Sequence, residues 1–118
     1  MAEQRMQSFE EFWPFYVAQH KKKSTRLLHY FGLLLAFVSI AVAFNSYKFW
    51  WLCLAPVFGY GFAWFAHYFV EKNTPATFTY FWWSILGDFR MFFLMSLGKM
   101  DSEINKILNR KRRVGDAR

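Results

Sequence analysis

The chain has 118 residues, which limits it to one domain at most. Hydrophobic residues make up 55% and aromatic residues 24% of the sequence, and three long segments are almost free of charge, so the composition excludes an ordinary soluble domain. The net charge of +7 lies mainly outside these segments, where it indicates an anionic lipid surface rather than a nucleic acid as partner.

Residues 1–26 are expected to form an interfacial amphipathic segment with a helix over residues 8–23. Ser8 followed by Glu11 is typical of a capping box. Pro14 fits poorly inside a helix, so a second possibility is a helix that starts at Pro14 after an irregular lead-in. Apolar and aromatic side chains at helical spacing form one stripe, which consists of Phe9, Phe12, Trp13, Tyr16 and His20.

Residues 27–70 contain two predicted transmembrane helices. Residues 27–44 and 49–70 carry no Asp, Glu, Lys or Arg, and each approaches the roughly 20 apolar residues that cross a bilayer. Basic residues precede the first segment, and seven more lie in the tail from Lys99 onward. Because basic flanks stay on the cytoplasmic side, we expect both termini to be cytoplasmic and the turn at residues 45–48 to face the opposite side.

A third apolar segment, residues 80–97, carries Asp88 and Arg90 at its centre. A central charge costs roughly 2.5–3.5 kcal/mol on the insertion scale, so we do not expect this segment to span the bilayer. It is expected to be re-entrant, to lie in the interface or to form a hairpin within the loop region 71–98. The basic tail, residues 99–118, should contain a short helix over 101–111. The predicted fold is therefore an all-α integral membrane protein with a single domain.

The three histidines are the candidate site. His29 lies about 18 residues before the turn and His67 about 19 after it, so at roughly 1.5 Å per residue the two should reach the same depth. Glu71 follows His67 by one helical turn, and His20 can fold back to the same level. A single interfacial histidine is usually an anchor, but the shared depth favours a common site. Two imidazoles and a carboxylate suit non-haem Fe(II); zinc is a weaker choice, and bis-histidine haem is also possible.

Three stretches carry a family resemblance: "FWPFYVAQHKKKSTRLLHYFG", "GYGFAWFAHYFVEKNTPATF" and "SILGDF". Over about residues 9–90 they resemble the membrane family named for the yeast Fe(II)-dependent 2-hydroxy fatty acid dioxygenase, in its short bacterial branch. The resemblance implies an endoplasmic-reticulum or bacterial inner-membrane protein in which His20, His29 and His67 bind iron. It also implies α-oxidation, in which O₂ shortens a 2-hydroxy fatty acid by one carbon. The aromatic run Tyr80–Trp83 and the basic tail depart from the family pattern.

The sequence thus predicts an Fe(II)-dependent membrane dioxygenase that acts on a fatty-acid substrate and does not bind nucleic acid. The alternative is a non-catalytic membrane scaffold or lipid-interacting protein, which needs no metal. Arg26 can meet a substrate carboxylate or serve as an inside-positive charge, and Asp88 orients an imidazole or joins a structural ion pair. The predicted site comprises the catalytic and metal-binding histidines His20, His29 and His67, the metal ligand Glu71, and their neighbours Arg26, Asn73 and Asp88.

Overall fold

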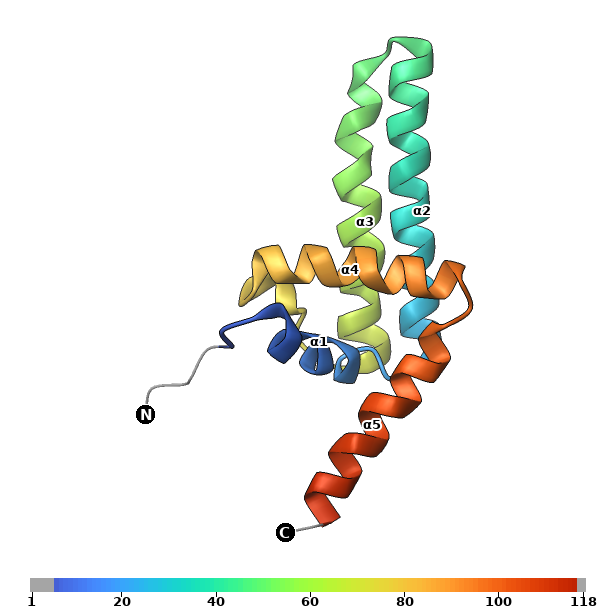
Figure 1. Cartoon of the computed structure of the whole chain (residues 1–118). Helices are drawn as coiled ribbons and strands as arrows, with labels where there is room; N and C mark the ends of the chain where they lie inside the picture. Colours follow the sequence, from blue (N-terminus) through green and yellow to red (C-terminus); the bar gives the residue numbers. More distant parts are fainter. Residues whose placement is uncertain (1–5, 117–118) are drawn as a thin grey trace. The chain divides into compact units, whose positions relative to one another are not determined.

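The computed structural model describes the backbone of residues 6–116 and the side chains of residues 6–110, and it contains helices but no strand over that range (Figure 1). The all-α prediction is therefore confirmed. The elements in chain order are α1 (Phe9–Ala18), α2 (Lys23–Ser46), η1 (Phe49–Cys53), α3 (Leu54–Phe65), η2 (Ala66–Glu71), η3 (Ala76–Phe78), α4 (Phe81–Ser96) and α5 (Met100–Asp116). They form two compact units, and the single domain predicted from length stays a prediction.

One unit, Lys22–Pro75, is a helical hairpin in which α2 packs along α3 (Figure 1). The chain reverses after Ser46, where Tyr47 adopts a left-handed backbone conformation with φ of 59°. The predicted turn at residues 45–48 is confirmed. The stretches Lys23–Ser46 and Phe49–Glu71 are both long and apolar enough to cross a membrane.

The hairpin reverses the usual distribution of side chains in a water-soluble core. Small or polar residues of α2 are buried, whereas large apolar residues such as Phe31, Val38 and Phe44 are exposed. Apart from Arg26, the buried residues recur at alternating intervals of four and three, which places them on one helix face. They are Thr25, His29, Gly32, Ala36, Ser39 and Ala43. Small residues at this spacing let two helix backbones approach closely, as they do in membrane helix pairs.

Helices α2 and α3 lie close together at Gly32. A Cβ atom built on Gly32 would lie 2.7 Å from the Cβ of Phe62 and 2.8 Å from the backbone oxygen of Phe58. One of these atoms is a backbone atom of α3, and the other is bonded directly to the backbone. Neither can move away unless the helix moves as well. Gly32 therefore sets the distance between the helices one turn away from His29.

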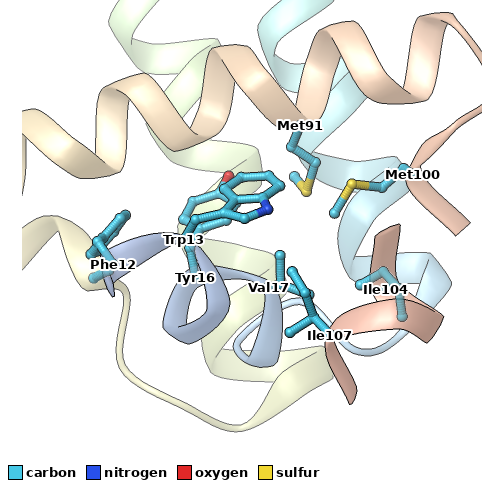
Figure 2. Close-up of a cluster of buried hydrophobic side chains, with 9 residues drawn as sticks. Phe12, Trp13, Tyr16, Val17, Met91, Met100, Ile104 and Ile107 are labelled. Atoms are coloured by element: carbon cyan, nitrogen blue, oxygen red, sulfur yellow. The ribbon is translucent and has the colours of Figure 1, made fainter. Parts of the chain in front are cut away.

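The second unit packs α1 against α4 and α5 around a hydrophobic cluster (Figure 2). Phe12, Trp13, Tyr16 and Val17 come from α1, and in Figure 2 the labelled side chains of the other two helices point toward them. Polar contacts lie beside the cluster: the indole N–H of Trp13 donates to Glu103 at 2.7 Å, and the Arg90 guanidinium lies 4.4 Å from the Trp13 ring centroid. The remaining members of the cluster are Ala76, Met91, Met100, Ile104 and Ile107.

Helix α1 begins at Phe9, directly after the predicted cap. The Ser8 hydroxyl accepts the backbone N–H of Glu11 at 3.2 Å, and the Glu11 carboxylate accepts the backbone N–H of Gln7 at 2.7 Å. Pro14 lies inside the helix, so the alternative start at Pro14 is wrong. The helix is also shorter than the predicted 8–23, because it ends at Ala18.

The third apolar segment is one continuous helix, α4, so the hairpin, one of the three alternatives expected for it, is wrong. Its two central charges have different partners. The Tyr16 hydroxyl donates to Asp88 at 2.5 Å, whereas Arg90 lies 3.9 Å from the Glu103 carboxylate. The two side chains are separated by two positions and so leave the helix in different directions. The C-terminal helix starts at Met100 and extends beyond the predicted 101–111.

Replacement of Gly32 by alanine should destabilise the hairpin, because the added methyl meets α3 backbone and either strains or separates the helices. We expect a loss of about 1–3 kcal/mol in unfolding free energy. Gly59→Ala is the matched control, because a Cβ there meets nothing within 4 Å. It should be neutral or stabilise the helix by up to about 1 kcal/mol. Thermal unfolding in detergent measures both, and equal midpoints would contradict the close approach.

Candidate metal centre

His29 and His67 form a buried pair inside the hairpin. Their Nε2 atoms are 3.2 Å apart, and the two rings are nearly perpendicular, with an interplanar angle of 86°. The exposed fractions are only 8% for His29 and 3% for His67. His29 comes from the second turn of α2 and His67 from η2, a π-helical segment. The predicted equal depth of these two histidines is confirmed.

Asn73 fixes the orientation of His67. The Asn73 side-chain Oδ1 lies 2.7 Å from Nδ1 of His67, and the Asn73 backbone N–H donates to the His67 carbonyl at 2.8 Å. An amide oxygen only accepts hydrogen bonds, so Nδ1 carries the proton in the neutral ring. The lone pair of neutral His67 is therefore on Nε2, the atom that faces His29. Single-turn π-helical segments such as η2 are frequent at functional sites.

His20, which directly follows α1 and its capping residue, is held in the same way by different atoms. Its Nδ1 lies 2.6 Å from the backbone oxygen of Tyr16, and its ring stacks on the Tyr16 ring with centroids 4.2 Å apart. A carbonyl oxygen also accepts only, so Nδ1 is the protonated nitrogen and Nε2 carries the lone pair of the neutral ring. His20 is fully buried. Second partners of this kind are typical of histidines that bind metals.

Tyr16 is itself fixed by α4. Its ring packs on Gly87, where an added Cβ would lie 2.8 Å from the ring, and its hydroxyl donates to Asp88. Burial raises the pKa of the Asp88 carboxyl to about 7, although the Tyr16 hydrogen bond lowers it. Burial and the nearby Asp88 charge raise the pKa of Tyr16 well above its ordinary value. The phenol therefore stays protonated and continues to donate at neutral pH.

His20, His29 and His67 form a group of buried histidines that could hold a metal ion. Each offers one ring nitrogen as a ligand atom; His29 and His67 belong to the hairpin unit and His20 to the other unit. An ion held about 2.0–2.1 Å from two imidazole nitrogens, the distance known for zinc, needs them about 2.8–3.4 Å apart for bond angles of about 90–110°. The 3.2 Å between Nε2 of His29 and Nε2 of His67 satisfies this requirement.

The other predicted site residues have these positions. Glu71 ends η2, and its Oε2 accepts the backbone N–H of Lys22 at 2.6 Å and the hydroxyl of Thr25 at 2.9 Å. Among the residues described here, the histidine group does not include Glu71, and its role as a metal ligand stays a prediction. Arg26 is buried in the first turn of α2, and its contact with a substrate carboxylate also stays a prediction.

Sequence reasoning assigned no site role to Tyr16 or Thr25. Tyr16 contacts His20 through both its ring and its carbonyl, and Thr25 binds Glu71. A signal was present, because each residue precedes a histidine by four positions and so shares its helix face. The Thr25 hydroxyl was the harder case, because its partner lies 46 residues away.

The architecture and the histidines define an all-helical protein with two candidate membrane spans and a potential metal centre. A family model described as "2-hydroxy-palmitic acid dioxygenase Mpo1-like" matches residues 6–100, and the chain belongs to this Mpo1-like family. The predicted family is therefore confirmed. The comparisons with curated proteins and with solved structures gave no match.

Asn73→Ala should weaken metal binding without unfolding the hairpin, because His67 loses the acceptor that selects its tautomer. Loss of such a partner typically costs 10–100-fold in metal affinity. Asn45→Ala is the control, because Asn45 donates to the Ala41 carbonyl near the turn of the hairpin. Titration with Co(II) in detergent measures the affinity. Equal Co(II) affinity in Asn73→Ala and wild type would refute the role of Asn73.

Proposed function

We propose that this protein is an Fe(II)-dependent membrane dioxygenase that acts on 2-hydroxy fatty acids. The observation that carries the proposal is the buried group of three histidines in a chain of the Mpo1-like family. The family description names 2-hydroxy-palmitic acid dioxygenase, which supports a 2-hydroxy acid as the substrate class. Imidazole nitrogens with open coordination positions suit iron and oxygen chemistry.

The reaction balances without a further cosubstrate. One 2-hydroxy acid and one O₂ give the acid one carbon shorter, CO₂ and water, and the substrate supplies all four electrons. Bound Fe(II) would supply the centre at which O₂ and the two oxygen-bearing groups of the substrate meet. The α-hydroxyl is essential, because it lies on the carbon that is oxidised and offers a second oxygen beside the carboxylate.

The protein's own residues would hold and orient these partners. His20, His29 and His67 would bind the ion through Nε2, while Asn73 and the Tyr16 carbonyl keep the Nδ1 protons of His67 and His20 in place. Arg26 precedes His29 by one turn, and its guanidinium would pair with the substrate carboxylate. Burial of the histidines would keep bulk water from the reacting atoms.

The distribution of side chains supports insertion of the hairpin into a bilayer. The most apolar 18-residue windows of Lys23–Ser46 and Phe49–Glu71 are only 28% and 11% buried, so most of their apolar surface faces outward. Such a surface is stable in hydrocarbon and unfavourable in water. We place the protein in the bacterial inner membrane or the endoplasmic reticulum. Basic residues before α2 and in the tail would keep both termini cytoplasmic.

Helix α4 would lie in the membrane interface, because it is apolar on two opposite faces. One face is buried in the hydrophobic cluster through Gly87 and Met91. The other is exposed and repeats at intervals of four and three residues, which is one stripe of a helix. This outer stripe consists of Trp82, Leu86, Phe89, Phe93 and Leu97. A helix that presents such an apolar stripe, in a protein with many basic residues, typically lies flat at the lipid surface.

Protein loaded with Fe(II) should convert 2-hydroxypalmitate and O₂ to the C15 acid without any added cosubstrate. Palmitate should be a poor substrate or an inhibitor, because it has the carboxylate but no α-hydroxyl. Product analysis by mass spectrometry is the measurement, and His67→Ala is the control that should lose both iron and activity. An iron-loaded, folded protein that leaves 2-hydroxy acids of several lengths intact would refute the dioxygenase and favour the lipid-interacting scaffold.

A probe at residue 86 should lie in lipid if the outer stripe of α4 enters the interface. Leu86→Cys in a Cys53→Ser background can be labelled with a fluorophore and reconstituted in vesicles that contain anionic lipid. A quencher dissolved in the lipid should reduce its fluorescence more than a water-soluble quencher does. Asn105→Cys, on an exposed position of α5, is the control and should show the opposite preference. Preferential aqueous quenching at both positions would contradict the interfacial placement.

A further inference from the structure

We infer that Glu71 is a positioning residue that sets the geometry of the histidine pair from outside the metal coordination sphere. This inference rests on the proposed function, because it assigns a role toward the proposed metal. It replaces the ligand role expected for Glu71 with a clamp between the end of η2 and the start of α2. All the contacts that carry it lie within the hairpin unit.

Three hydrogen bonds form the clamp. Oε2 of Glu71 accepts the backbone N–H of Lys22 at 2.6 Å and the Thr25 hydroxyl at 2.9 Å. In the opposite direction, the Lys22 ammonium donates to the carbonyl of Val70 at 2.9 Å. Thr25 is fully buried, so water cannot easily replace Glu71 as the hydrogen-bond acceptor of its hydroxyl. A carboxylate that receives two donors on one oxygen makes charge-assisted hydrogen bonds, which are stronger than neutral ones.

Helix α2 needs this carboxylate because it has no cap of its own. Lys22 occupies the capping position without a side-chain capping bond, and the first turn contains no acidic residue. In a capping box, an acidic side chain three positions into the helix accepts the N–H of the capping residue. Thr25 occupies that position in α2, and Glu71 supplies the missing acceptor from another segment. Its negative charge also offsets the helix dipole and the neighbouring lysines.

The clamp lies one helical turn from the histidine pair and in register with it. Thr25 precedes His29 by four residues, and Glu71 follows His67 by four residues. Two cross-helix contacts therefore follow one another along the hairpin: Thr25 with Glu71 and His29 with His67. Because the helices are antiparallel, a slip of either helix would break both contacts together. Gly32 fixes the separation of the helices on the other side of the pair.

We therefore expect metal affinity to depend mainly on a hydrogen-bond acceptor at residue 71 and less on its negative charge. Glu71→Gln keeps an oxygen that accepts both donors, whereas Glu71→Ala removes it. Co(II) affinity, followed by its visible absorption in detergent, should fall at least tenfold in Glu71→Ala and stay within about threefold of wild type in Glu71→Gln. A true ligand would behave differently, because an amide is a much poorer metal ligand than a carboxylate.

Thr25 provides a second test that does not depend on the folding of Glu71→Ala. Thr25→Val keeps the shape but removes the hydroxyl, and Thr25→Ser keeps the hydroxyl. Thr25→Val should weaken Co(II) binding and shift the Co(II) absorption bands, while Thr25→Ser should not. In a double-mutant cycle, Thr25→Val should have little further effect in the Glu71→Ala background, because Thr25 acts through Glu71.

The results separate this inference from the function on which it rests. Equal losses of Co(II) affinity in Glu71→Gln and Glu71→Ala would make Glu71 a ligand and overturn the clamp. Lower thermal midpoints with unchanged Co(II) affinity and spectrum in Glu71→Ala and Thr25→Val would reduce the clamp to a stabilising cap and also overturn the inference. Both results leave wild-type Co(II) binding intact. Wild-type protein without any Co(II) site would instead overturn the proposed metal function and this role with it.

Discussion

The close approach of α2 and α3 at Gly32 is the constraint on which the candidate site depends. An imidazole reaches only a few ångströms from its own backbone, so two histidines on different helices meet only when the helix backbones are close. The small residues of α2 make this possible, because they bury backbone against backbone instead of filling the space with large side chains. The large apolar residues are consequently displaced to the outer surface. One sequence pattern thus explains both the polar interior of the hairpin and its apolar exterior.

Neutral oxygen atoms hold the Nδ1 nitrogens of His67 and His20. The Asn73 amide oxygen and the Tyr16 backbone carbonyl determine which nitrogen carries the proton. A neutral partner selects the tautomer without adding a negative charge to a buried site. The one carboxylate close in sequence, Glu71, is engaged with the N-terminal groups of α2. Asp88 accepts the hydroxyl of Tyr16, and it is Tyr16 that contacts the imidazole of His20.

Features that depend on spacing along one helix were predictable from the sequence. The equal depth of His29 and His67 follows from residue counts and helical rise, and the Ser8 cap follows from local hydrogen bonding. Features that depend on a partner far along the chain were not predictable. The local cost of proline made a helix that starts at Pro14 a second possibility, yet Pro14 lies inside α1, where the aromatic residues around it are buried. The role of the Thr25 hydroxyl likewise could not be predicted, because it depends on the hydrogen bond to Glu71.

The separation of the two imidazoles along the chain has a consequence for biosynthesis. During translation, His29 is synthesised with the first half of the hairpin, before His67 and before Glu71, whose carboxylate caps α2. At that stage the first helix has an uncapped, lysine-rich beginning and carries only part of the donor set. Capture of an ion at the proposed metal centre would therefore have to await completion of the second helix, and an interrupted chain would carry no assembled centre with which to generate reactive oxygen species.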